Sequence, residues 1–197
     1  MEEEEESSIY VKVILLGESG VGKTSLINVA VGIDYTDILN ITASPTFVTK
    51  KFNKFNKEYI LNIWDTAGQE KFRAMTKLFI KDAKIAILVY AIDDKKSFEC
   101  LSFWALTVKE ILGEEVILAL VGNKSDLYLK EEIKAEVAND YAKSLNAKFK
   151  IVSAKLNPRI FISFLEELLD DYLEKNEEMP KRESFEIKKE KYKKKKK

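Results

Sequence analysis

The sequence predicts an α/β domain built on a mostly parallel six-stranded sheet, with one antiparallel edge hairpin and helices on both faces. Short apolar runs that suit buried strands alternate with longer segments of helical periodicity along most of the chain. Two neighbouring strand-like runs, 47–55 and 58–64, are close enough to form a hairpin with its turn at Asn56-Lys57. In such sheets ligands bind outside the carboxyl ends of the strands, where the loops gather.

The first part of the chain begins with a strand that runs into a helix. Residues 9–16 (IYVKVILL) alternate at first and then become continuously apolar, so they predict a buried strand before a glycine-rich turn. A helix over 23–31 follows. Residues 32–46 contain glycine, aspartate, asparagine and proline, which predict a loop. Beyond the hairpin, residues 66–80 predict a loop that passes into a short helix.

The rest of the chain alternates between strands and helices. Three short apolar runs predict buried strands, at 85–91 (IAILVYA), 116–121 and 148–152. Helical periodicity predicts helices between and after them, at 95–112, 130–145 and 160–173, the last with an apolar stripe. This strand–helix alternation is what predicts the parallel part of the sheet.

Length and charge predict one domain with two charged ends. The 197 residues divide into an acidic, disordered N-terminus over 1–8, a domain over 9–176, and a lysine-rich flexible tail over 177–197. The chain is 46% hydrophobic, enough for a core, and its formal net charge is zero. The body without its ends is slightly acidic, so we expect no nucleic-acid binding.

Composition also excludes several kinds of site and location. The chain has no histidine, which rules out a Ser-His-Asp triad and a histidine-ligated metal. Its one cysteine, Cys100, suits a reducing compartment. The N-terminus has no apolar signal segment, and apolar runs fall far short of a membrane span. We therefore expect a cytoplasmic protein.

A phosphate-binding loop is the most specific motif in the chain. The segment 17–24 (GESGVGKT) fits G-x-x-x-x-G-K-[ST] between a predicted strand and a predicted helix. Its backbone N–H groups and the helix N-terminus suit phosphate oxygens. Lys23 would contact the β- and γ-phosphates, and the Thr24 hydroxyl would ligate Mg²⁺. The candidate nucleotide-binding residues here are Glu18, Ser19, Gly20, Val21, Gly22, Lys23, Thr24 and Ser25.

A second motif, WDTAGQE, ends the third predicted strand. Asp65 would emerge at the carboxyl edge and bind the metal through water. Gly68 would bring a backbone N–H close to the γ-phosphate, and Gln69 would orient the attacking water. With Lys23, these two residues are the candidate catalytic groups. A polar turn at a strand end is the structural alternative for this segment.

The base end of the site follows the next two strands. In the segment NKSD, Asp126 can accept hydrogen bonds from the N1–H and the exocyclic amine of guanine, a donor pair that adenine lacks. Lys124 can lie over the base. Ser153-Ala154-Lys155 can supply a backbone N–H to the guanine O6, and Tyr35 can cover the base edge. Asn123 completes the candidate set.

Together, GESGVGKTS, WDTAGQE, NKSD and SAK resemble the guanine-nucleotide motifs of Ras-superfamily GTPases, over about residues 9–175. The tryptophan of WDTAGQE, with Phe47 and Phe79, resembles the aromatic triad that effectors of the Rab branch contact. The resemblance implies a P-loop NTPase fold and a slow GTPase with bound GTP or GDP and Mg²⁺. It also implies exchange factors, GTPase-activating proteins and effectors in membrane traffic.

Two threonines can complete the Mg²⁺ shell in switch I. Thr42 aligns with the Rab pattern Thr-x-Gly-x-x-Phe without a gap, ending at Phe47, so we prefer it. Thr46 follows Pro45 as in Ras itself, but it would need a longer loop. Ser44 stands where Rabs have glycine, and Ala91 stands where they usually have aspartate.

The C-terminal tail departs from the Rab pattern. It ends in five lysines and has no prenylation cysteine, so either the sequence stops short or the protein is not prenylated. The lysine run predicts weak, salt-sensitive binding to anionic membranes, and a solvated tail is the alternative. Two alternatives to a hydrolysing switch also stay open: a nucleotide-locked interaction module, and a general P-loop ATPase, against which Asp126 argues.

Overall fold

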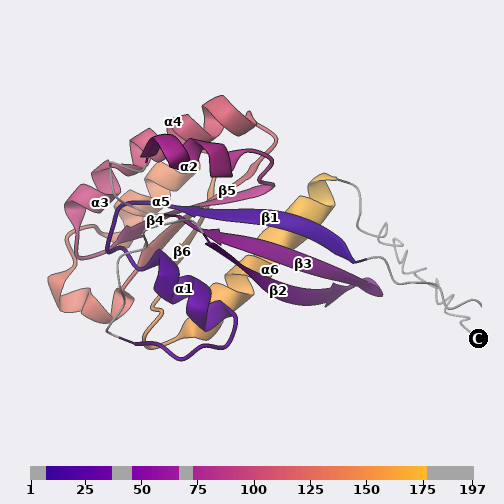
Figure 1. The fold of residues 1–197 in the computed structure, drawn as a ribbon. Helices are drawn as coiled ribbons and strands as arrows, with labels where there is room; N and C mark the ends of the chain where they lie inside the picture. Colours follow the sequence, from indigo (N-terminus) through magenta and orange to yellow (C-terminus); the bar gives the residue numbers. More distant parts are fainter. Residues whose placement is uncertain (1–7, 37–45, 67–72, 177–197) are drawn as a thin grey trace, which may run out of the picture.

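The structure is a computed structural model that describes residues 8–36, 46–66 and 73–176. Its six-stranded sheet has the order β2-β3-β1-β4-β5-β6. Strands β1 (Ile9–Leu16), β3 (Lys57–Asp65), β4 (Ile85–Ala91), β5 (Ile117–Asn123) and β6 (Lys148–Ile151) run parallel. Strand β2 (Thr46–Lys54) is antiparallel to β3 at one edge. The predicted sheet is confirmed (Figure 1).

Helices cover both faces of this sheet, as expected. Helices α1 (Lys23–Ala30) and α6 (Pro158–Lys175) pack into one core cluster. Helices α2 (Arg73–Ile80), α4 (Leu101–Leu112) and α5 (Ala135–Ser144) pack into the other. Strand β1 explains the two clusters, because side chains alternate across a strand: Val13 and Leu15 enter the first, whereas Ile14 enters the second.

Strands β1 and β4 have the predicted bounds, the other four strands differ from theirs by one or two residues, and the hairpin turn is displaced. The turn is Phe55-Asn56, one residue before the predicted Asn56-Lys57, and Lys54 pairs with Lys57. Both turn residues have positive φ, 51° and 58°. A two-residue hairpin turn with both φ positive matches the right-handed twist of the flanking strands, which explains the shorter turn.

The predicted helix over 130–145 begins later than expected. A 3₁₀ helix, η2 (Ser125–Lys130), precedes it, and α5 starts only at Ala135. The backbone N–H groups of Glu132 and Ile133 donate to the carbonyl of Ile92, at 2.8 and 3.3 Å. These two hydrogen bonds fix the segment between η2 and α5 beside the end of β4. The chain becomes helical only after this segment.

The predicted helix over 95–112 is divided at Cys100 into α3 (Lys95–Glu99) and α4. Asp94 caps α3, its carboxylate accepting a hydrogen bond from the Ser97 N–H at 3.1 Å. Cys100 itself keeps helical dihedral angles, so no loop separates the two helices. The cysteine is half-buried, which agrees with a packing role.

Helix α6 is longer than the predicted 160–173 and is tied to both sheet edges. Pro158 occupies its first turn, where proline removes no helical hydrogen bond. The ammonium of Lys54 on β2 pairs with Glu166 at 2.8 Å and with Asp170 at 3.0 Å. On the opposite edge, Lys148 of β6 pairs with Asp171 at 2.8 Å. The helix therefore bridges the two edge strands across one face of the sheet.

Candidate functional site

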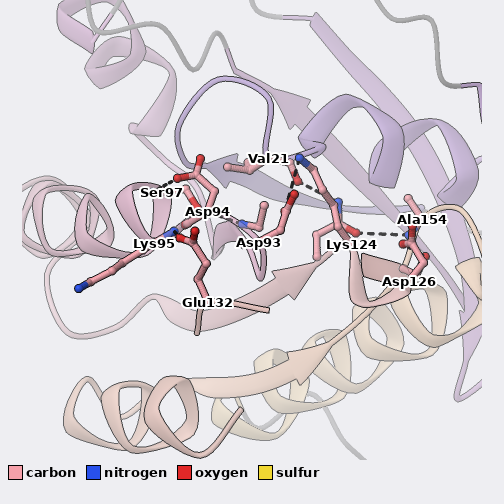
Figure 2. Close-up of polar contacts among 12 residues, drawn as sticks. Val21, Asp93, Asp94, Lys95, Ser97, Lys124, Asp126, Glu132 and Ala154 are labelled. Atoms are coloured by element: carbon pink, nitrogen blue, oxygen red, sulfur yellow. Dashed lines mark hydrogen bonds and ion pairs between the residues drawn. The ribbon is translucent and has the colours of Figure 1, made fainter. Parts of the chain in front are cut away.

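The predicted site residues gather at the carboxyl edge of the parallel strands. The loop after β1 lies beside the end of β3, and the loops after β4, β5 and β6 continue along the same edge (Figures 1 and 2). These segments are far apart in sequence, and it is the strand order that brings them together. This is where open α/β sheets bind ligands.

Two glycines let the loop after β1 pass close to the neighbouring strands, because a side chain at either position would collide with them. A Cβ at Gly17, where φ is 152°, would lie 2.1 Å from the carbonyl oxygen of Val89. A Cβ at Gly22, where φ is 94°, would lie 2.3 Å from Nδ2 of Asn123. Gly22 is also the N-cap of α1. The loop thus lies close to β4 and β5 and directs the N-terminus of α1 into the site.

Lys23 is buried under this loop with only 5% of its surface exposed. Its ammonium donates to the carbonyls of Gly17 at 2.9 Å and Glu18 at 2.8 Å. Burial lowers the pKa of Lys23 to about 8, although the charges of Asp65 and Glu18 act in the opposite direction. A bound phosphate would favour the charged ammonium, so this lysine is suited to an anionic ligand.

Thr24 and Asp65 place two oxygen groups side by side. The Thr24 hydroxyl donates to Oδ2 of Asp65 at 2.7 Å, and Asp65 is 4% exposed at the end of β3. The Thr66 hydroxyl donates to the carbonyl of Leu15 at 2.6 Å, which fixes this strand end against β1. Oxygen ligands of this kind suit Mg²⁺. The described residues contain no group of three or more histidine, cysteine or acidic side chains placed to hold a metal ion.

Asn123 joins three loops of the site. Its side-chain amide is buried and donates to the carbonyl of Val21 at 2.9 Å, while its Oδ1 accepts from the N–H of Ala154 at 3.3 Å. One side chain therefore connects the phosphate loop, the end of β5 and the loop after β6. Its assignment as a nucleotide-binding residue stays a prediction, and within the described residues its side chain contacts these loops.

Asp126 is fixed by the loop after β6. The hydroxyl of Ser153 donates to Oδ1 of Asp126 at 2.6 Å and accepts from the N–H of Leu156 at 3.0 Å. Lys124 precedes it in a left-handed conformation, with φ 64° and ψ 37°. Tyr35 and Lys155 also meet here, with the lysine Nζ 5.6 Å from the centre of the ring. Among the seven residues predicted for the base end, these contacts join Asp126 to Ser153 and Tyr35 to Lys155.

The remaining predicted residues divide into two groups. Ser19 and Gly20 are exposed on the phosphate loop, and Ser25 is half-buried in the first turn of α1. Thr42, Gly68 and Gln69 lie outside the described residues, so their assignments stay predictions.

Sequence reasoning missed Asp93. It lies at the carboxyl edge just beyond β4, and its Oδ1 is 3.8 Å from the ammonium of Lys124. The available signal was its position: two consecutive aspartates, 93 and 94, follow an apolar strand at the same edge as NKSD. Ala91, which stands where Rabs usually have aspartate, fits its surroundings: the residue is fully buried and its N–H donates to the Ser97 hydroxyl.

The three aromatic residues of the predicted Rab triad do come together. The rings of Phe47 and Trp64 stack with centroids 5.0 Å apart, and those of Trp64 and Phe79 are 5.6 Å apart. Phe47 is 52% exposed, so one end of the cluster faces solvent. The ammonium of Lys12 lies 5.0 Å from the Trp64 ring centre.

Comparison with known proteins decides the family. A sequence model of the Ras family matches residues 12–172. The chain belongs to the Ras family. Within this family of small GTPases it resembles Ras-related protein Rab-21 of Homo sapiens, with 42% identity over 155 residues that cover 79% of this chain and 69% of the relative. Ras-related protein Rab-11C of Dictyostelium discoideum is 34% identical over 172 residues, covering 87% of this chain and 77% of the relative.

A third relative extends the same likeness. Ras-related protein RabJ of Dictyostelium discoideum is 38% identical over 159 residues, covering 81% of this chain and 62% of the relative. The protein is therefore a Rab-like small GTPase, an enzyme that hydrolyses GTP to GDP and phosphate. None of the helices in the described segments is long and apolar enough to cross a membrane.

Proposed function

We propose that this GTPase is a Mg²⁺-dependent molecular switch that alternates between GTP and GDP states and acts in membrane traffic through effector proteins. The observation that carries the proposal is the placement of a phosphate end and a base end on one sheet edge. Lys23 with the Thr24–Asp65 pair forms the first, and Asp126 with Ser153 forms the second.

At the phosphate end, the buried ammonium of Lys23 would neutralise the β- and γ-phosphates after exchanging its contacts with Gly17 and Glu18. The Thr24 hydroxyl would ligate Mg²⁺ directly and Asp65 would do so through water. The ion would supply charge neutralisation between the phosphates. Thr42 is our preferred further ligand, with Thr46 as the alternative.

At the base end, the Ser153 hydroxyl orients one carboxylate oxygen of Asp126. The fixed carboxylate would accept from the N1–H and the exocyclic amine of guanine. ATP would leave this acceptor unmatched, which costs affinity and disfavours the general ATPase alternative. Lys124 would lie over the base face, Tyr35 would cover its edge, and the Ala154 loop would offer an N–H to O6.

Switching would couple the γ-phosphate to the aromatic triad. Residues 37–45 lead directly into β2, which carries Phe47, and residues 67–72 lie between Trp64 on β3 and Phe79 on α2. Family members order such segments around the γ-phosphate and release them after hydrolysis. Effectors, exchange factors and GTPase-activating proteins are the partners this implies, and the lysine tail would add weak contact with anionic membranes.

The switch is tested by comparing the protein loaded with GDP and with a non-hydrolysable GTP analogue. We expect slower amide hydrogen exchange in peptides covering 37–45 and 67–72 in the GTP-analogue state, because γ-phosphate contacts order them. We also expect a change in tryptophan fluorescence that Trp64→Phe removes. Trp104, which is fully buried in α4, remains as an internal reference.

A nucleotide-locked module with a static surface gives a different result. It would bind both nucleotides yet show the same exchange and the same fluorescence in both states. That outcome would contradict the switch while leaving guanine-nucleotide binding intact.

A further inference from the structure

The base end of the site contains an ion pair between two loops that follow adjacent strands. Asp93 follows β4 and Lys124 follows β5, and the carboxylate oxygen Oδ1 of Asp93 lies 3.8 Å from Nζ of Lys124 (Figure 2). The side chains are 21% and 34% exposed, so the pair is partly shielded from solvent. Its position beside Asp126 makes it relevant to how the base is held.

Asp93 sits in a backbone segment that is held on both sides. The N–H of Ile92 donates to the carbonyl of Asn123 at 3.0 Å, and the carbonyl of Ile92 accepts from Glu132 at 2.8 Å. On the other side, Asp94 caps α3, and the carboxylate of Glu132 accepts from the N–H of Lys95 at 2.8 Å. A carboxylate on so constrained a segment acts as a fixed charge.

Among the described residues, Asp93 forms an ion pair with Lys124. Its Oδ1 is buried and accepts no hydrogen bond from the described part of the chain. The neighbouring carboxylates of Asp94 and Glu132 are occupied with backbone N–H groups of α3. The charge of this oxygen is therefore compensated by the Lys124 ammonium, in a contact of the modest strength that a partly exposed ion pair has.

The backbone of Lys124 has an unusual conformation that the surrounding structure must stabilise. A residue other than glycine with φ 64° and ψ 37° is in a sparsely populated conformation, which persists only when its surroundings fix it. At 3.8 Å the pair is a charge contact longer than a hydrogen bond, so the ammonium keeps its N–H donors for other acceptors.

We propose that Asp93 is a positioning residue for guanine-nucleotide binding: it holds the ammonium of Lys124 at the β4–β5 edge, so that the lysine stem lies across the face of the base. This inference rests on the proposed function of the base end. The base would then be held by the Asp93–Lys124 ion pair, acting through the lysine stem, as well as by the hydrogen bonds of Asp126. The expected consequence is slower release of nucleotide.

The test measures the dissociation rate of fluorescent GDP from the full chain in the presence of Mg²⁺. Asp93→Asn keeps the shape and removes the charge, so we expect release to become roughly fivefold faster, the size typical of a partly exposed ion pair. Asp93→Glu, which keeps the charge, should restore part of the loss. The difference between wild type and Asp93→Asn should shrink at high salt.

A double-variant cycle separates positioning from a merely structural role. In a Lys124→Ala background, Asp93→Asn should change the release rate by less than about twofold, because the partner through which it acts is gone. As a matched control, Asp140→Asn removes an exposed carboxylate that pairs with Lys143 at 3.2 Å on α5, and it should leave release unchanged.

Three outcomes would overturn the proposal. The first is a wild-type release rate in Asp93→Asn. The second is an equal acceleration by Asp93→Asn in the Lys124→Ala background. The third is an Asp93→Glu variant that releases nucleotide as fast as Asp93→Asn. Failure of the proposed function is distinguishable from all of these, because the wild-type protein itself would then retain no fluorescent GDP.

Discussion

Replacing Asp126 with Asn is expected to lower GTP affinity by at least about 100-fold and to create binding for XTP. In the variant, the amide oxygen can still accept from the Ser153 hydroxyl, so the side chain keeps its orientation. The new NH₂ group would then meet the guanine donors and repel them. Xanthine carries a carbonyl where guanine has its exocyclic amine, and this carbonyl would accept from the new donor.

The measurement is a competition titration of GTP and XTP against a fluorescent nucleotide, with wild type and variant side by side. Ser153→Ala is the matched comparison, because it removes the orienting hydroxyl and keeps the carboxylate. It should weaken GTP binding by a smaller factor without any gain for XTP. Full GTP affinity in Asp126→Asn, with no XTP binding, would show that another group recognises the base.

The second large effect concerns hydrolysis. We expect the purified protein to hydrolyse bound GTP at roughly 10⁻⁴ to 10⁻² per second, and an arginine supplied by a partner to accelerate this by about 10³ to 10⁵. The chain contains only three arginines, Arg73, Arg159 and Arg182, and none lies in the stretch 35–41 before Thr42. Arg73 begins α2, and Arg159 is exposed at the start of α6.

Single-turnover hydrolysis of GTP-loaded protein without a partner measures the basal rate. Gln69→Leu should lower this rate further and leave nucleotide affinity nearly intact, since Gln69 would orient water and contribute little to binding. A basal rate near one per second would mean that an unidentified group completes the charge compensation. Arg73→Ala would then be the variant to examine.

The sequence predicted most of the fold because its strands have strong local signals. Strands β1 and β4 have the predicted bounds, since apolar residues dominate both runs, Gly17 follows the first and Lys84 precedes the second. The late start of α5 depends on backbone hydrogen bonds from Glu132 and Ile133 to Ile92, forty residues earlier. No local pattern encodes such a contact, so the predicted helix began too early.

The site residues were likewise predicted where a local motif marks them and missed where only a distant contact does. Motifs with fixed spacing placed Lys23, Thr24, Asp65 and Asp126 at one edge, because each motif lies at or soon after the carboxyl end of a strand. The ion pair of Asp93 with Lys124 was missed, since it joins two adjacent strand ends whose neighbourhood only the strand order reveals. The linking role of Asn123 was missed for the same reason.

The identity of the bound nucleotide tests the guanine-nucleotide site most directly. Protein purified without added nucleotide, then treated with a Mg²⁺ chelator, should release GDP or GTP in near-equal molar amount to protein, identified by chromatography and mass. Without the chelator, release of the nucleotide should be much slower, because Thr24, Asp65 and the phosphates would all bind the same Mg²⁺ ion. Recovery of ADP or ATP instead, or displacement of the bound nucleotide by ATP as readily as by GTP, would contradict the guanine-nucleotide site.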